Sequence, residues 1–158
     1  MNNKKILRSA IEQCDLHTKR IETALKHIHQ LAPFTPQKLS TLKDEEIAFL
    51  ELLTSRLAKL QDTIGQKIFP NILTLLQEDI SNKSFIDILN KLEKLGFLDN
   101  VEHWKHIREI RNAISHDYPE HPQLVADNLN QALTATQELL TYWHELRQQL
   151  EQRVLKKI

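Results

Sequence analysis

Hydrophobic residues recur at steps of three and four along most of the chain, with charged and polar residues between them. This spacing places the hydrophobic side chains on one face of a helix and therefore predicts amphipathic helices. The predicted helices span residues 7–28, 42–76, 85–95, 100–116 and 122–154. Five helices with short connections predict an all-α fold, an up-and-down antiparallel helical bundle.

Prolines and capping residues indicate where the first two helices begin and end. Pro33 and Pro36 are expected to end the first helix and to leave residues 31–40 as a loop. Thr41 is the expected N-cap of the second helix, because acidic residues follow it where the helix dipole favours them. Pro70 is expected to kink that helix at the preceding residue.

The later helices have similar signals. Ser84 and Asp99 are the expected N-caps of the next two helices, the second in a capping-box pattern, and Gly96 is expected to close the helix between them. Pro119 disfavours helical geometry at the residue before it, so the fourth helix is expected to end at about residue 116 or 117. Pro122 suits the first turn of the last helix.

The composition indicates one soluble domain that spans residues 1–158. A chain of this length can bury roughly 68–70% of its unfolded surface, so it needs no disulfides. The single cysteine, Cys14, leaves no disulfide framework and no cysteine zinc site, and we expect a cytoplasmic protein. We expect neither a signal peptide nor a membrane span, since the charged residues interrupt every long apolar run.

The charge is balanced, with 21 basic and 21 acidic side chains. Any attraction to nucleic acid must therefore come from a local patch. The most basic stretch is opposed in the sequence only by Glu102 and Glu109, and we expect it to be able to hold a phosphate. Its members are His103, Lys105, His106, Arg108, Arg111 and His116.

Residues 111–118 carry the candidate chemistry. Arg108, Asn112 and His116 are four residues apart and share a helix face. Arg111 and His116 are five apart, or about 140° around an ideal helix, so a straight helix does not bring them together. The length of the arginine side chain, or a looser helix end before Pro119, could close this gap.

An arginine, an asparagine and a histidine near one helix end provide the groups that metal-free RNA cleavage requires. His116 can take a proton from a ribose 2′-hydroxyl or give one to the leaving 5′-oxygen. Arg111 can hold two phosphate oxygens and stabilise the charge of the transition state. Asn112 and Arg108 are the expected supporting residues, with Asn112 orienting either group.

The order Arg111, Asn112, His116, Tyr118 resembles the Arg-polar-x-x-x-His-x-Tyr motif of the HEPN superfamily. In particular, it resembles the HepT-like toxins that are paired with minimal nucleotidyltransferases. Residues 55–65 also resemble the second helix of that group, and with the helix that starts at about Trp104 the similarity covers about half the chain directly. Every position of the motif is present, although this chain is longer than a minimal member.

The resemblance implies a HEPN-like bundle that forms a homodimer through the motif-bearing helices, so that Arg111 and His116 of two copies face one composite cleft. The implied activity is that of a metal-independent endoribonuclease toxin that cleaves an RNA such as tRNA or mRNA and leaves a 2′,3′-cyclic phosphate. The implied partner is a minimal nucleotidyltransferase antitoxin that adds AMP to Tyr118 and so keeps RNA from the cleft. No metal or other cofactor is implied.

Other interpretations stay open. Arg111 and His116 could be solvated helix residues, with Arg111 paired to a nearby carboxylate. The chain could be a non-catalytic nucleotide-binding or regulatory partner of a nucleotidyltransferase, or a helical interaction protein without an active site. His103 and His106 could ligate a metal, but no residue at matching spacing completes the set.

Two further predictions concern the core and four of the remaining histidines. We expect Cys14, Trp104 and Trp143 to be buried in the core, because they lie on hydrophobic stripes. Four of the remaining histidines, His17, His27, His29 and His144, are expected at the surface or at its boundary.

Overall fold

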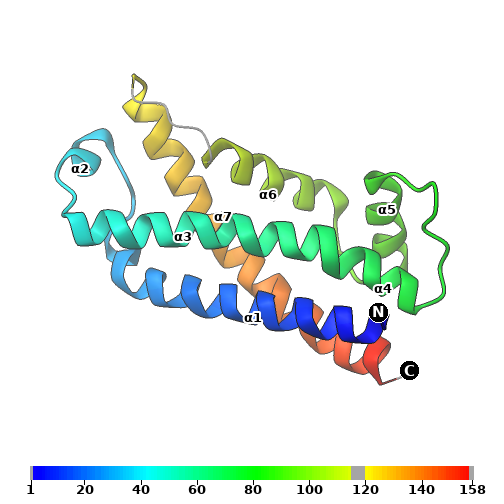
Figure 1. Cartoon of the computed structure of the whole chain (residues 1–158). Coiled ribbons are helices and arrows are strands. Elements are labelled where there is room, and N and C mark those ends of the chain that lie inside the picture. Colours follow the sequence, from blue (N-terminus) through cyan, green and yellow to red (C-terminus); the bar gives the residue numbers. More distant parts are fainter. Residues whose placement is uncertain (1, 115–119, 157–158) are drawn as a thin grey trace.

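The computed structural model describes residues 2–114 and 120–156, and the regular structure within these ranges is helical throughout. The four long helices alternate in direction, as the pattern predicted for an up-and-down bundle (Figure 1). They are α1 (Asn3–Ile28), α3 (Asp44–Thr63), α6 (Val101–Ile114) and α7 (Pro122–Gln149).

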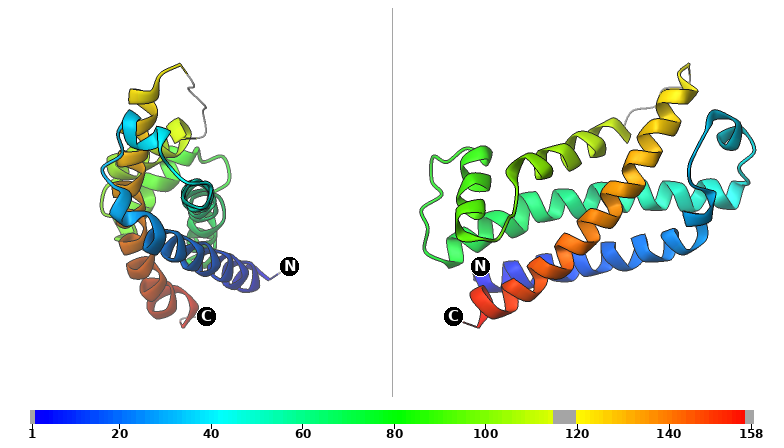
Figure 2. Two further views of the ribbon diagram at one scale, coloured as in Figure 1. Left: turned by 90° about the vertical axis from the view of Figure 1, so that its left-hand side faces the viewer. Right: turned by 180° about the vertical axis from the view of Figure 1, so that it is seen from behind.

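α1 and α3 lie side by side, α6 packs against both α3 and α7, and α7 crosses behind α3 (Figures 1 and 2). The shorter α5 (Phe85–Leu95) stands across one end of the bundle. The two ends of the described chain lie at the same end of the long helices (Figure 2, right). In the described part of the chain, no helix is both long enough and apolar enough to cross a membrane.

The hydrophobic stripes form one continuous core. The predictions for Cys14, Trp104 and Trp143 are confirmed, because all three side chains are buried. Burial raises the pKa of the Cys14 thiol well above its ordinary value, with a smaller contribution from the charge of Asp15, so the thiol stays protonated and is a poor nucleophile.

The prediction of a loop over residues 31–40 is wrong in its second half, which forms the short helix α2 (Pro36–Ser40). Thr35 caps this helix by accepting a hydrogen bond of 3.1 Å from the Lys38 N–H. Pro36 then occupies the first turn, where its missing N–H costs nothing. The loop before α2 is attached to α7 by Asn130, whose side chain bonds both the N–H and the C=O of Phe34.

Thr41 is not the N-cap of the second long helix. The Thr41 hydroxyl donates back to the carbonyl of Lys38 and so closes α2. Lys43 holds the N-cap position of α3, and its N–H donates to Glu46 Oε1 at 2.9 Å. Acidic residues fill the first turn of α3, as the dipole argument requires.

The interruption predicted at Pro70 lies one turn earlier. The helix passes from α3 into a π-helical turn, Ile64–Ile68, and continues as α4 (Phe69–Leu75). A proline clashes with the carbonyl four residues before it, and the wider π turn supplies the space that the ring needs. The predicted continuation of the helix beyond Pro70 is confirmed.

The predicted caps of α5 are confirmed, with Ser84 at its start and the left-handed Gly96 at its end. The cap of α6 is Asn100 and not Asp99, since Asn100 Oδ1 accepts the N–H of His103 at 3.2 Å. Glu93 of α5 accepts the N–H of Val101 at 2.8 Å, which fixes the start of α6 one residue later than predicted. The predicted end of this helix at residue 116 or 117 lies outside the described residues.

Candidate functional site

α6 carries the described part of the motif. Its inner face is buried, with Val101, Trp104, Ile107 and Ile110 at successive turns. Arg111 and Asn112, the polar motif residues that the structure describes, therefore lie on the opposite side of α6 or at its edge. Arg108 and Asn112 are exposed, and Arg111 is half-buried.

Arg111 forms a bidentate pair with Asp62 of α3. Its Nε donates to Asp62 Oδ1 at 3.1 Å, and its Nη2 donates to Oδ2 at 2.9 Å. The side chains keep 26% and 36% of their surface exposed, so the pair lies at the edge of the bundle and not in the core. The hydrogen bonds to Asp62 raise the pKa of Arg111, against the opposing effect of partial burial, so the guanidinium is always charged.

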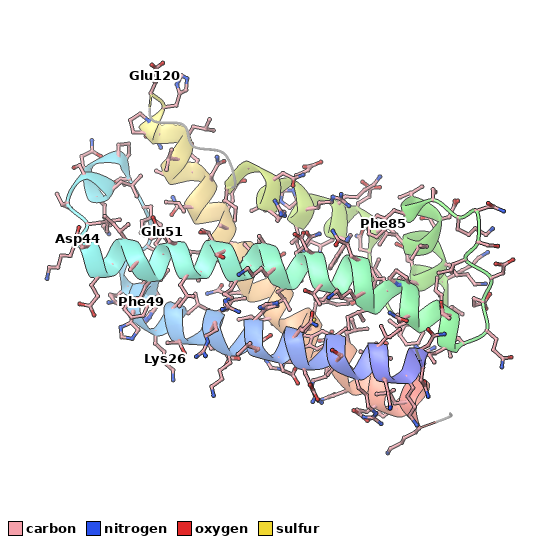
Figure 3. The ribbon with its side chains drawn as sticks, in the orientation of Figure 1. Lys26, Asp44, Phe49, Glu51, Phe85 and Glu120 are labelled. Carbon is pink, nitrogen blue, oxygen red and sulfur yellow. The ribbon has the colours of Figure 1, made fainter. Side chains whose placement is uncertain are left out.

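Arg108 lies beside α5. Its guanidinium carbon is 5.5 Å from the ring centroid of Phe85, which lies at the start of α5 (Figure 3). This contact is within the range of a cation–π interaction. An open groove of about 500 Å³ runs along the outer face of α6 and includes both Arg108 and Asn112 in its lining.

The other basic residues of the stretch that the structure describes lie next to carboxylates. Lys105 Nζ is 3.6 Å from Glu102 Oε1, and His106 Nδ1 is 3.9 Å from Glu109 Oε2. The His103 ring is hydrogen-bonded to Glu138 of α7.

Asp62 and Glu138 thus add negative charge to a stretch that is basic in the sequence. Among the described residues of this stretch, the groups left for the predicted binding of a phosphate are therefore Arg108 and the part of Arg111 that faces away from Asp62, and that binding stays a prediction.

Asp62 is the residue of this site that sequence reasoning missed. The possibility that a nearby carboxylate pairs with Arg111 was left open, and the structure identifies that carboxylate. Asp62 lies within residues 55–65, the second stretch of the HEPN resemblance, and it directly follows the buried Gln61. That position was the available signal, but the sequence alone did not relate it to a residue 49 positions away.

His116 and Tyr118 lie outside the described residues, so the predicted approach of His116 to Arg111 stays a prediction. Tyr118 likewise stays a predicted modification site. Within residues 2–114 and 120–156, no group of three or more His, Cys, Asp or Glu side chains is placed to hold a metal ion.

The comparisons with known proteins identify no relative: no family model, no curated protein and no solved structure matches this chain.

Proposed function

We propose that the chain is a metal-independent endoribonuclease of the HEPN type, a toxin in which Arg111 and His116 act on RNA in a cleft between two copies. The motif of residues 111–118 is the basis of this proposal. The main structural support for the proposal is the placement of Arg111. This residue is charged, partly exposed and held by Asp62 at the end of α6. This end of α6 leads directly into the segment that contains His116.

The reaction is an in-line displacement at phosphorus. His116 takes the proton of the 2′-hydroxyl, the 2′-oxygen forms a bond to phosphorus, and the bond from phosphorus to the 5′-oxygen breaks. A histidine returns a proton to the 5′-oxygen. In the composite cleft, this histidine is His116 of the second copy. Arg111 stabilises the charge on the phosphate oxygens, and the products are a 2′,3′-cyclic phosphate and a free 5′-hydroxyl.

The test is cleavage of RNA by the purified chain in the presence of a metal chelator, with the ends of the products identified. We expect Arg111→Ala and His116→Ala to lower the rate by roughly 10²-fold or more. The matched control is Arg147→Ala, which removes an arginine that also pairs with an aspartate but lies on α7. Cleavage that persists in Arg111→Ala would contradict the proposal.

The proposed regulation is tested separately. Co-expression with a minimal nucleotidyltransferase is expected to add the mass of one or more AMP units to the chain. The addition should be absent in Tyr118→Phe. Addition at another residue would remove Tyr118 from the proposal and leave the nuclease chemistry as it is.

A second candidate function is a non-catalytic nucleotide-binding partner of a nucleotidyltransferase. The charge balance of α6 favours it, because Lys105 and Arg111 each have a carboxylate within 4 Å, whereas long RNA prefers a continuous basic path. This function predicts binding of a nucleotide that depends on Arg111, without cleavage of RNA.

A further inference from the structure

We propose that Asp62 is a positioning residue for Arg111, which fixes the guanidinium so that its Nη1 side is presented to the phosphate. This inference rests on the proposed function and adds a residue of α3 to the site. Asp62 receives Nε and Nη2, which form one edge of the planar guanidinium. The Nη1 amino group lies off that edge and provides donors for an oxyanion while the pair stays intact.

The geometry favours positioning over simple stabilisation. Partly exposed ion pairs contribute only about 0.2–1 kcal/mol to the free energy of unfolding, so this pair does little for the fold. Two parallel hydrogen bonds nevertheless restrict the guanidinium to one plane and one direction. A single-point contact, such as that of a lysine, would leave the orientation free.

The backbone on both sides of the pair is anchored. Asp62 follows the buried Leu60 and Gln61, and Arg111 follows the buried Ile110. The core therefore fixes both Cα positions, while the charged ends stay accessible to a ligand. This arrangement, with a rigid support and a partly exposed charged group, suits a residue that must meet a phosphate in one defined orientation.

Asp62 also bears on affinity. Its negative charge lies next to the region where a phosphate would bind, so it cannot strengthen the binding of RNA. A residue that weakens or leaves unchanged the binding of the substrate, yet is needed for the reaction, acts on kcat.

The main experiment compares Asp62→Asn with the wild-type chain in RNA cleavage. Asparagine keeps the shape of the side chain but cannot accept both guanidinium N–H groups. We expect kcat to fall about tenfold or more, with KM unchanged or lower. Asp62→Glu, which restores the carboxylate, is expected to recover part of the loss. The matched control is Asp15→Asn, which weakens the pair with Arg147 and should leave kcat unchanged.

A second measurement does not depend on cleavage. The Arg111 Nε–H signal is followed by NMR during a titration with inorganic phosphate. In the wild type we expect the Nε–H signal to keep its position, because Asp62 holds that edge, while the Nη signals respond. In Asp62→Asn, the edge of the Arg111 guanidinium formed by Nε and Nη2 is free to bind phosphate, so the Nε–H signal should move.

The outcomes separate this inference from the proposed function. If the wild type cleaves RNA and Asp62→Asn cleaves equally well or faster, the positioning role is overturned and the nuclease stands. If no chain cleaves RNA, the nuclease fails, and the phosphate titration decides the role of Asp62. A wild-type Nε–H signal that moves with phosphate, or Arg111 signals that ignore phosphate in both chains, would overturn the positioning role.

Discussion

Among the described residues, two arginine–aspartate pairs join helices of this bundle, and they differ in what else the aspartate holds. Arg147 of α7 donates from Nε to both carboxylate oxygens of Asp15 of α1, at 3.0 and 2.9 Å. Asp15 Oδ1 also accepts the indole N–H of the buried Trp143 at 3.0 Å. For Asp62, the donors among the described residues are two nitrogens of Arg111.

The difference indicates two uses of similar chemistry. Asp15 satisfies a buried donor, the Trp143 N–H, although its own side chain keeps 39% of its surface exposed. Asp62 satisfies no buried group among the described residues and acts on the direction of one guanidinium. The first pair should therefore matter for stability, and the second for the chemistry of the site.

The largest expected effect on stability is that of Asp15→Ala. Removal of this carboxylate leaves the Trp143 N–H buried without its acceptor, and an unsatisfied buried donor costs about 1–3 kcal/mol. We expect the free energy of unfolding, measured by urea denaturation, to fall by about 2 kcal/mol. In Asp62→Ala, the control, the loss should stay below about 1 kcal/mol. Equal losses would remove the distinction between the two pairs.

The sequence predicted the helices well because their periodicity reflects burial, and burial decides which segments are helical. The stripes that contain Cys14, Trp104 and Trp143 are buried as expected. The errors lie at helix ends. Thr41 and Asp99 both have side chains suited to capping, but the N-cap depends on which residue leaves the helical conformation, and in α6 on Glu93 from another helix.

The candidate site was only partly predictable for a related reason. Arg111 and its neighbours on α6 could be found from their spacing, which is a local property of one helix. The contacts of Arg111 with Asp62 and of His103 with Glu138 join different helices, and they depend on how those helices pack. A single sequence does not indicate which residues of different helices will pair. The basic stretch therefore carries fewer opposing carboxylates in the sequence than it has around it in the structure.

The next prediction concerns a contact between an arginine and a histidine, in which no carboxylate takes part. Arg56 Nη1 of α3 lies 3.0 Å from His17 Nδ1 of α1. Burial lowers the pKa of His17 below its ordinary 6.5, and the charge of Arg56 lowers it further. The unfolded chain therefore binds more protons just below pH 6.5, so this contribution to stability is complete above that pH and is lost as the pH falls.

We expect the free energy of unfolding to fall between about pH 7.5 and about pH 5.5, by less than the Asp15→Ala effect. The fall should be smaller in His17→Gln, which serves as the control for the other histidines. In Arg56→Gln the NMR titration midpoint of His17 should rise. A midpoint that does not change would mean that burial and the charges of Lys59 and Lys67 set the pKa of His17 without Arg56.

The smallest expected effect concerns the packing of α3 against α6 near Asp62. Gly65 lies in the π-helical turn, and a methyl group there would meet Trp104 Cζ2 at 3.4 Å and Phe85 Cζ at 3.5 Å. These are ordinary contacts, and alanine loses less conformational freedom than glycine on folding. We therefore expect Gly65→Ala to raise the free energy of unfolding by about 0.5 kcal/mol.

Gly96→Ala is the matched control for Gly65→Ala, because Gly96 has a φ of +84° and an alanine there is strained. Gly96→Ala should lower the free energy of unfolding by roughly 1 kcal/mol. Since the methyl group at position 65 leaves both Asp62 and Arg111 in place, RNA cleavage should be unchanged in Gly65→Ala. A loss of cleavage without a loss of stability would show that Arg111 responds to small shifts between α3 and α6, which would extend the positioning role from the Asp62 carboxylate to the helix that carries it.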